Sequence, residues 1–245
     1  MIILGLDTAT STASVALVED GELVAEESYD KSIKPRQGSA NHSNGNHSEI
    51  LLSLIQSVLH RGKISLTDLS GLAVSIGPGS FTGLRVALAT VKGIAYDSGL
   101  PVVGVSTLHA SAARVSDHEG TIGSLLDARK QEVYAAIYRR QGQTLTPLSE
   151  EQVCSIGAAI ETLRATGAVN PVVVGDGAKL YAPLLAQAFG GSVQVSADDE
   201  LGSVAAQVAK LPWSRFTDHA YDDLASLAPR YVRSPEAENR RALQR

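Results

Sequence analysis

The sequence has few aromatic residues, a single cysteine and no excess of basic residues. Aromatic residues make up 4% of the 245-residue chain, and the formal net charge is −5. Proteins that bind single-stranded nucleic acid by themselves use aromatic side chains for base stacking, and they bind phosphates mainly through Lys and Arg. We therefore expect no autonomous nucleic-acid-binding domain. An intramolecular disulfide is excluded, because Cys154 has no second cysteine to pair with.

The sequence also lacks the pattern of a signal peptide or a membrane span. Asp7 interrupts the apolar N-terminal run, and no charged segment precedes that run. With 44% hydrophobic and 19% charged residues, the composition is typical of a globular protein. We expect a soluble cytoplasmic protein without membrane contact, long enough for one large or two small domains.

The most informative stretch is a strand that leads through a glycine-rich turn into a helix. The apolar run at residues 71–76 is too short for a helix and predicts a buried strand. The Gly-Pro-Gly turn at residues 77–79 can redirect the chain sharply, and Ser80 or Thr82 can cap the element that follows. Apolar residues then recur at helical spacing over residues 84–95, which predicts a helix with one apolar stripe.

Two turns are candidates for contact with a nucleotide or a metal. Free amides at the helix start after residues 77–79 can bind an anion, although no Gly-Lys-Ser/Thr follows as in a P-loop. At residues 7–10, hydroxyls flank a carboxylate that can hold a hydrated metal or face a phosphate. The alternatives are glycines that serve only packing, and an Asx turn at Asp7. The candidate nucleotide-facing residues are Asp7, Thr8, Thr10, Gly77, Gly79 and Ser80.

The order of the predicted elements indicates an α/β protein with a ribonuclease-H-type first domain. Its strands are predicted at residues 2–6, 13–18, 23–28, 71–76 and 101–105, and its helices at residues 48–59, 82–96 and 107–115. A change of composition at residues 116–120 precedes a second, smaller domain. Its strands are predicted at residues 122–126, 132–138 and 171–174, and helices follow at residues 156–166, 180–188 and 201–210.

Two polar segments have no apolar period. Residues 29–46 predict a long loop, and His42 and His47 near its end are not at the i, i+4 spacing of a helical metal site. We therefore expect no metal site there. The charged C-terminal segment, with Arg240 and Arg241, is expected to be a solvated tail, and contact with RNA is the alternative.

Four sequence blocks resemble the TsaB family, also called YeaZ. They are LGLDTATSTASVAL near the N-terminus, GPGSFTGLRVALATVKGIA in the centre, DARKQEVYAAIY at residues 127–138 and PRYVRSPEAE near the C-terminus. The blocks are spread over nearly the full length in the order of the family, which makes the resemblance specific.

The resemblance implies an actin-like (ASKHA) two-lobed α/β fold, built from ribonuclease-H-like halves with mixed sheets. The expected first lobe comprises residues 1–106 with about 215–235, and it carries the partner interface. Residues 107–214 form the smaller second lobe, and residues 236–245 a charged tail.

The resemblance also implies a function in tRNA modification. In this family the protein is the non-catalytic dimerisation and activating subunit of a complex. The complex transfers a threonylcarbamoyl group to N6 of the adenosine adjacent to the anticodon in tRNAs that read ANN codons. The implied partners are TsaD, in a heterodimer, and the small ATPase TsaE, and the complex provides an indirect link to tRNA. No cofactor of its own is expected, because ATP and metal belong to the partner complex.

The absence of catalysis can be examined at individual positions. The resemblance implies that the catalytic relative TsaD binds a metal through an Asn-His-x-x-x-His pair just after the strand equivalent to residues 102–105. Here Thr107 and Ser111 occupy the two ligand positions, and His109 stands alone between them. Hydroxyls are poor ligands for transition metals. We therefore expect no metal and no catalytic residues in this chain.

Without catalytic residues, the function expected of this chain is to bind a partner protein. The resemblance implies that the helices at residues 48–59 and 82–96 pair with the same two helices of TsaD. The residues expected at this interface are Leu51, Leu54, Ile55, Leu84, Arg85, Leu88 and Val91. Because an isologous surface is self-complementary, the isolated protein can also form a homodimer through it. The loop at residues 30–46 is longer than is usual for the family.

Two enzymatic alternatives remain open. A small-molecule kinase or ATPase of the actin-like superfamily would use the turns at residues 7–10 and 175–177 as nucleotide loops. A metallopeptidase is the other alternative, but no His-Glu-x-x-His cluster supports it.

Overall fold

The computed structural model describes residues 1–30, 47–196 and 201–233. The predictions for the long loop with His42 and for the charged tail at residues 236–245 lie outside the described residues. The chain divides into two compact units. Unit 1 consists of Met1–Asp117 and Ala197–Pro229, and unit 2 consists of His118–Ser196 and the chain from Arg230 onward.

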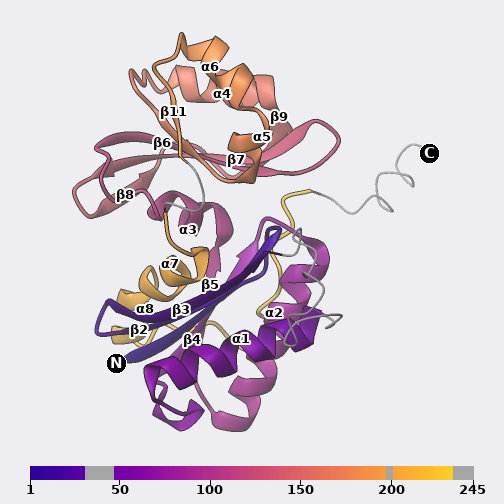
Figure 1. The fold of residues 1–245 in the computed structure, drawn as a ribbon, viewed down its shortest axis with the longest axis vertical. Helices are drawn as coiled ribbons and strands as arrows, with labels where there is room; N and C mark the ends of the chain where they lie inside the picture. The colour runs from indigo at the N-terminus through magenta and orange to yellow at the C-terminus, as the bar shows by residue number, and fades with distance from the viewer. Residues whose placement is uncertain (31–46, 197–200, 234–245) are drawn as a thin grey trace, which may run out of the picture. The chain divides into compact units, whose positions relative to one another are not determined.

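Unit 1 is built on a five-stranded mixed sheet with the strand order β3-β2-β1-β4-β5 (Figure 1). The strands are β1 (Ile2–Asp7), β2 (Thr12–Glu19), β3 (Glu22–Asp30), β4 (Gly71–Gly77) and β5 (Val102–Ser106). β1 pairs antiparallel with β2 and parallel with β4. Asp20 and Gly21, with φ of 48° and 87°, form a tight turn between β2 and β3, in the gap between the strands predicted at residues 13–18 and 23–28.

Helices cover both faces of this sheet, because its strands alternate apolar side chains between two cores. The helices of unit 1 are α1 (His47–Gly62), α2 (Phe81–Ser98), α3 (Thr107–Ala113), α7 (Val204–Lys210) and α8 (Trp213–Thr217), with a short 3₁₀ helix at Leu66–Asp68. Leu4 and Val74 face α1 and α2 in the larger core. Ile3 and Val103 face the opposite side, where α3 and α7 contribute Ala110 and other small residues.

Unit 2 contains a six-stranded sheet with the order β11-β10-β6-β7-β8, in which β9 also pairs with β7. Its strands are β6 (Gly120–Asp127), β7 (Glu132–Gln141), β8 (Thr144–Pro147), β9 (Gln152–Ser155), β10 (Val172–Val174) and β11 (Gln194–Val195). Its helices are α4 (Ile156–Ala165), α5 (Asp176–Leu180) and α6 (Ala182–Phe189). Leu163 and Leu185 from the helices close the core against the strands.

The two sheets share one strand order. In unit 1 the hairpin β1-β2 is extended by β4, parallel to β1, and then by β5. In unit 2 the hairpin β6-β7 is extended by β10, parallel to β6, and then by β11. The expected α/β architecture of two halves with mixed sheets is therefore confirmed.

The unit boundaries differ from the expected lobe boundaries at residues 106 and 215. Helices α3 and α7, which the resemblance assigns to the second lobe, pack against the sheet of unit 1. For α3 this agrees with the order of elements, which placed the helix at residues 107–115 in the first domain. Gly5 on β1 allows α7 to approach, since a side chain there would collide with Ala205 and Ala209. Both helices therefore complete the second core of unit 1.

The predicted helices and strands all occur, with ends shifted by a few residues. The helix predicted at residues 180–188 is divided at Tyr181 between α5 and α6. The short elements β8, β9, β11 and α8 are not predicted from the sequence. Over the described part of the chain, no helix combines the length and apolar character that crossing a membrane requires.

Candidate functional site

The turn after β4 and the turn after β1 pack directly against each other. The Ser80 amide donates to the carbonyl oxygen of Ala9 (2.6 Å), and the hydroxyl of Thr8 donates to the carbonyl oxygen of Gly83 (2.6 Å). A side chain at Gly79 would overlap Ala9, and a side chain at Gly83 would overlap Thr8. These glycines therefore allow two backbones to approach closely.

The start of helix α2 is capped by the protein itself. Ser80 is the N-cap, and its hydroxyl accepts the amide of Gly83 (3.2 Å). The Ser80 amide is bonded to Ala9, as described above. Two of the amides that a phosphate would need at this helix end are thus already hydrogen-bonded within the chain.

Asp7 ends β1 in a buried position, with 1% of its surface exposed. One of its carboxylate oxygens accepts the Ala9 amide (3.3 Å), which is the contact of an Asx turn. Thr10 bonds within the same turn, because its hydroxyl contacts both the carbonyl oxygen and the amide of Thr12. The structure therefore brings Thr8 and Ala9 to the Gly-Pro-Gly turn and the start of α2. The contacts described for Asp7 and Thr10 lie within their own turn.

Helix α3 starts directly after β5 and carries the two hydroxyl residues singled out in the sequence. Thr107 and Ser111 are 0% and 1% exposed, and among the described residues neither hydroxyl has a hydrogen-bond partner. The amide of His109 donates to the Ser106 hydroxyl, which caps the helix (3.2 Å). No three or more His, Cys, Asp or Glu side chains within the described ranges are placed to hold a metal ion.

The apolar residues expected at the partner interface lie in the core of unit 1. The exposed fraction is at most 4% for all six, namely Leu51, Leu54, Ile55, Leu84, Leu88 and Val91. Leu84 is buried, and the other five pack in the larger core, where the apolar stripes of α1 and α2 cover the sheet. The expectation that these six side chains form a contact surface is corrected on this point. Arg85 is exposed.

Helices α1 and α2 each expose large apolar side chains to solvent. Leu52 on α1 is 49% exposed, and Phe81 and Tyr96 on α2 are 53% and 88% exposed. The guanidinium of Arg85 lies over the ring of Phe81, 3.8 Å from the ring centroid. Arg85, Ala89 and Tyr96 share the outward side of α2 with Phe81. Periodicity alone could not separate this face from the buried stripe.

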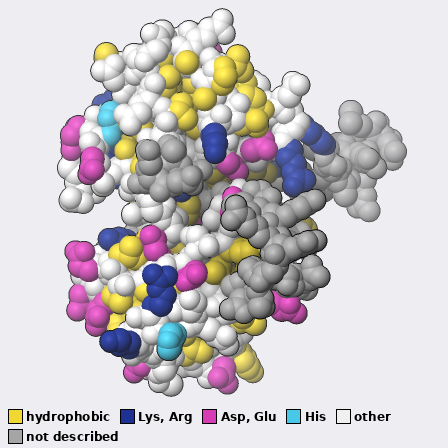
Figure 2. All heavy atoms as spheres, in the orientation of Figure 1, with side chains coloured by type: hydrophobic (Ala, Val, Ile, Leu, Met, Phe, Trp, Pro, Cys, Tyr) yellow, Lys and Arg dark blue, Asp and Glu magenta, His cyan; other side chains and the backbone are white. Residues whose placement is uncertain are grey.

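Unit 2 carries an apolar groove of about 430 Å³ between α4 and α6. Ile156, Ile160 and Leu184 contribute to its lining, and Figure 2 shows hydrophobic side chains gathered over these helices. Arg164 at the groove pairs with Glu161 (3.1 Å) and donates to the carbonyl oxygen of Ala188. None of the site residues predicted from the sequence lines this groove. The turn at residues 175–177, the second nucleotide loop of the kinase alternative, belongs to unit 2, and the other predicted site residues belong to unit 1.

The turn between β6 and β7 has an unusual backbone. Arg129, Lys130 and Gln131 have φ of 61°, 53° and 63°, which is the left-handed region. For residues other than glycine this conformation costs about 1 kcal/mol or more each. The turn is held by the Asp127 carboxylate, which accepts the Arg129 amide (2.8 Å). The Asp127 amide in turn donates to the Asp176 carboxylate (2.9 Å).

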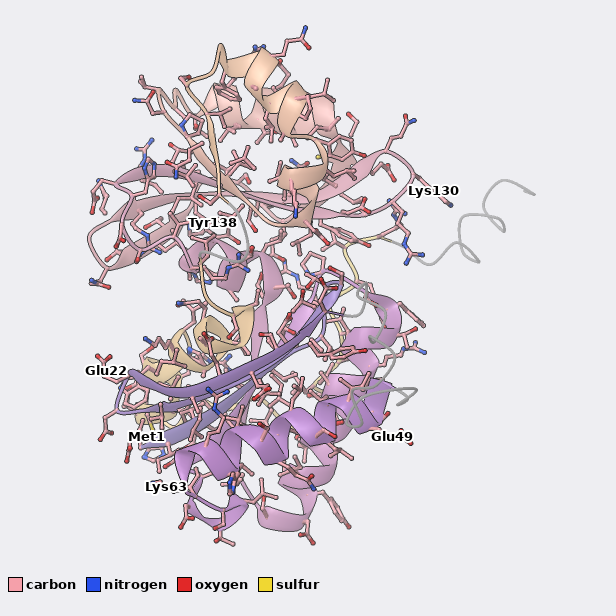
Figure 3. The ribbon with its side chains drawn as sticks, viewed as in Figure 1. Met1, Glu22, Glu49, Lys63, Lys130 and Tyr138 are labelled. Atoms are coloured by element: carbon pink, nitrogen blue, oxygen red, sulfur yellow. The ribbon has the colours of Figure 1, made fainter. Side chains whose placement is uncertain are left out.

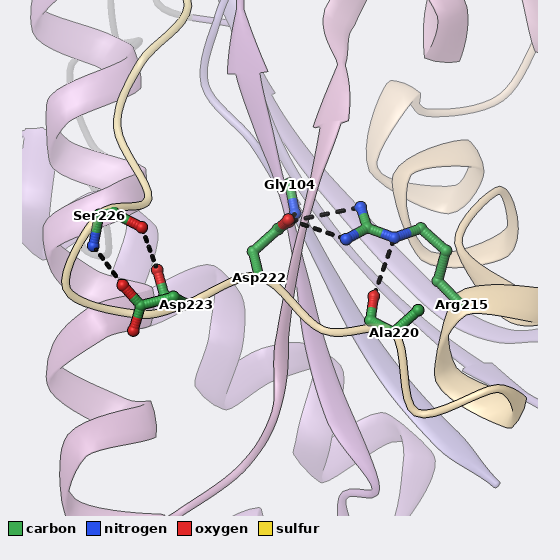
Figure 4. A network of polar contacts seen from close by, with 6 residues as sticks. All are labelled: Gly104, Arg215, Ala220, Asp222, Asp223 and Ser226. Carbon is green, nitrogen blue, oxygen red and sulfur yellow. Dashed lines mark hydrogen bonds and ion pairs between the residues drawn. The ribbon is translucent and has the colours of Figure 1, made fainter.

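A polar network ties the C-terminal part of unit 1 to the edge strand β5 (Figure 4). The carboxylate of Asp222 accepts the Gly104 amide (2.7 Å) and a guanidinium nitrogen of Arg215 (2.8 Å). The Asp222 amide donates to the carbonyl oxygen of Val102 (3.0 Å). Burial raises the pKa of Asp222, but the hydrogen bonds from Arg215 and Gly104 and the charge of Arg215 outweigh it, so the pKa is below its ordinary value.

Comparison with known sequences identifies close relatives. The family model described as TsaD, tRNA N6-adenosine threonylcarbamoyltransferase, matches residues 27–241. The tRNA threonylcarbamoyladenosine biosynthesis protein TsaB of Escherichia coli is 39% identical over 142 residues, which are 57% of this chain and 56% of that protein. TsaB of Haemophilus influenzae is 30% identical over 202 residues, covering 78% of this chain and 79% of that protein.

Solved structures share the fold. A Pseudomonas aeruginosa protein described as similar to the peptidase YeaZ superimposes with a TM-score of 0.73 at 22% identity, covering 95% of this chain and 99% of that one. A ROK hexokinase from Thermus thermophilus gives a TM-score of 0.50 at 12% identity, covering 89% of this chain and 100% of that one. These likenesses show the actin-like fold alone. From the family model and the sequence relatives together, we conclude that this chain belongs to the TsaB (YeaZ) family.

Proposed function

We propose that this chain is a non-catalytic subunit in the biosynthesis of threonylcarbamoyladenosine in tRNA, the process for which its TsaB relatives are named. Its complex would transfer a threonylcarbamoyl group to N6 of the adenosine next to the anticodon in tRNAs that read ANN codons. The observation that carries the proposal is the similarity to TsaB of Haemophilus influenzae over 78% of the chain.

The non-catalytic role is supported by the donor set at the head of α3. Thr107 and Ser111 supply only hydroxyl oxygens, and both are buried. A transition metal prefers imidazole, thiolate or carboxylate ligands. The metal and the ATP of the reaction are therefore assigned to the partner complex, and this chain is proposed to hold no cofactor of its own.

The exposed face of α1 and α2 is the surface we propose for binding TsaD. Leu52, Phe81 and Tyr96 expose large apolar side chains there, and Arg85 stacked on Phe81 adds a guanidinium. Aromatic residues and Arg are the side chains most often found at the energetic centre of interfaces. The proposed assembly is a heterodimer with TsaD to which TsaE binds, and tRNA is reached through the complex. The isolated chain would homodimerise through the same face.

A kinase or ATPase of the actin-like superfamily is the alternative. Two features disfavour it. Amides at the start of α2 are already hydrogen-bonded to Ala9 and Ser80, and the Asp7 carboxylate accepts an amide of its own turn. Calorimetry of the chain alone with ATP and magnesium separates the two proposals. Stoichiometric binding without a partner would favour the kinase.

The proposed function is tested by reconstituting the modification with TsaD, TsaE, a threonylcarbamoyl donor and tRNA, with and without this chain. We expect modification to depend on the chain. Equal modification in both reactions would refute the role.

The proposed interface is tested by Leu52→Asp and Tyr96→Asp, which place charges on the exposed face without changing the core. We expect both variants to fold and to lose at least tenfold in affinity for TsaD, because a desolvated charge disrupts an interface. Leu180→Asp is the matched control, since Leu180 is 56% exposed on unit 2. If both test variants bind TsaD with wild-type affinity, the interface does not lie on this surface.

A further inference from the structure

A short segment near the C-terminus, residues 230–233, belongs to unit 2 although it forms neither helix nor strand. The residues directly before it, Ala197–Pro229, belong to unit 1. The chain thus returns after Pro229 to unit 2, which it left after Ser196. No helix or strand fixes residues 230–233 there, so their attachment depends on other contacts.

Two ion pairs attach this segment. Arg230 pairs with Glu151 (3.3 Å), and Arg233 pairs with Glu132. The two carboxylates lie at opposite ends of β9. Glu151 directly precedes this strand, and Glu132 on β7 is paired with its last residue, Ser155.

The spacing of the two arginines matches the spacing of the two carboxylates. β9 has four residues, so the carboxylates at its ends are separated by about 13 Å along the strand. An extended chain advances about 3.3–3.6 Å per residue, so the step from Arg230 to Arg233 covers up to about 11 Å. The long side chains cover the remainder. The segment can therefore lie along β9 with both ion pairs closed.

The main chain of Glu132 is held by the turn that precedes it. In that turn Lys130 lies at the outer end of the β6-β7 hairpin (Figure 3). The Glu132 amide donates to the carbonyl oxygen of Arg129 (3.0 Å), and the Glu132 carbonyl oxygen accepts the Ala128 amide (3.0 Å). Opening of this ion pair is therefore a movement of side chains and of the segment that carries Arg233.

The two ion pairs differ in burial. The side chain of Glu151 is 10% exposed, and its oxygen that faces Arg230 is buried. The side chain of Glu132 is 41% exposed. An ion pair in contact with water is screened by salt and contributes up to about 1 kcal/mol, whereas a buried carboxylate that loses its partner costs more. The pair at Arg233 is therefore the weaker of the two.

We propose that residues 230–233 form an ionic latch on unit 2, with an outer end at Arg233 that opens with salt and an inner end at Arg230 that stays closed. Opening of the outer end breaks no helix and no strand, so it requires no unfolding of unit 2. The latch is independent of the proposed function, because it is a property of the isolated chain.

Trypsin tests the latch directly, because it must bind an arginine side chain before it cuts the following peptide bond. An arginine that is paired with a carboxylate is protected, and the cleavage rate follows the fraction of open pairs. Rates are measured by mass spectrometry and divided by those of short peptides with the same two sequences. We expect faster cleavage after Arg233 than after Arg230. At about 1 M sodium chloride, where the Debye length is about 3 Å, only cleavage after Arg233 should rise, by about two- to fivefold.

Two variants open the ends of the latch separately. Glu132→Gln should accelerate cleavage after Arg233 by about two- to fivefold at low salt and leave cleavage after Arg230 unchanged. Glu151→Gln should accelerate cleavage after Arg230 by at least about tenfold, because the buried pair protects more strongly.

The matched control is Glu161→Gln, which removes an exposed ion pair with Arg164 on the same unit and should change neither cleavage rate. Salt-independent cleavage after Arg233, or a wild-type rate there in Glu132→Gln, would overturn the latch. Equal acceleration of both cleavages in either variant would also overturn it, because the segment would then be released only when unit 2 unfolds. If Glu151→Gln does not fold, the salt series on wild type and Glu132→Gln still decide the outcome.

Discussion

Gly83 and Gly93 lie on the same helix, α2, but have opposite surroundings. A Cβ atom at Gly83 would collide with the carbonyl of Thr8, whereas a Cβ atom at Gly93 would meet nothing within 4 Å. We expect Gly83→Ala to lower the free energy of unfolding by about 1–3 kcal/mol. Gly93→Ala should raise it by about 0.5–1 kcal/mol through helix propensity. Urea denaturation of both variants checks this, and equal effects would contradict the close approach of the two turns.

We expect Asp222 to make unit 1 less stable as the pH falls into the acid range. Its pKa in the folded chain is below the ordinary value, so its contribution is present above about pH 4 and is lost as the pH falls through the folded-state pKa. We expect Asp222→Asn to lower the free energy of unfolding at pH 7 by about 1–3 kcal/mol, and the difference from wild type to shrink below about pH 4. Denaturation at several pH values tests this.

The control for this experiment is Asp218→Asn, an exposed carboxylate in the same segment. It should change stability little at either pH. A difference between wild type and Asp222→Asn that stays constant down to pH 2 would show that the network acts through shape and not through charge.

At Asp7 the sequence supports two interpretations, and local geometry favours one. A carboxylate before two hydroxyls predicts either an anion- or metal-facing turn or an Asx turn. In the structure the Ala9 amide donates to the Asp7 carboxylate, which is the hydrogen bond of an Asx turn. Sequence could not decide, because the choice depends on the Gly-Pro-Gly turn, which is distant in the chain and packs against Ala9.

At the scale of elements, periodicity locates the helices but not what covers them. The apolar stripes of α1 and α2 are predicted correctly, and α2 ends at a left-handed cap, Gly99, a few residues beyond the predicted helix. The same stripes are predicted as a partner surface, yet Leu84 and Val91 are fully buried. A stripe that packs on a sheet and a stripe that packs on another protein have the same sequence pattern.

Leu88 and Leu52 provide a test of the buried and exposed faces. Leu88 is 4% exposed on α2, and Leu52 is 49% exposed on α1. We expect Leu88→Ala to lower the free energy of unfolding by about 2–5 kcal/mol, and Leu52→Ala to change it by less than about 0.5 kcal/mol. Denaturant unfolding measures both. A large loss of stability in Leu52→Ala would contradict its exposed position.

The short elements escape prediction for a physical reason. β11 has two residues, and β8 and β9 have four each, which is at or below the shortest run in which an alternating pattern can be recognised. Their positions are fixed by pairing with β10 and β7. Tertiary pairing of this kind is invisible in local sequence.

At the scale of the whole molecule, two sheets of the same order have separate cores. Leu163 is 1% exposed in the core of unit 2. We expect Leu163→Ala to destabilise that core by about 2–5 kcal/mol, and hydrogen exchange to accelerate in β6, β7 and β10 while β1 and β4 keep their protection. Equal acceleration in both sheets would show that the units unfold as one.

Unit 1 is interrupted in sequence by unit 2, and this determines the order in which a ribosome can complete them. All five strands of the first sheet have been synthesised by Ser106, but α7, which covers one of its faces, starts at Val204. At typical translation rates the delay is roughly 5–20 s. The sheet and helices of unit 2 are synthesised before α7, so their core is the first whose elements are all available. During that interval Ile3 and Val103 have α3 but lack α7, so part of this core remains apolar surface that a chaperone can bind during translation.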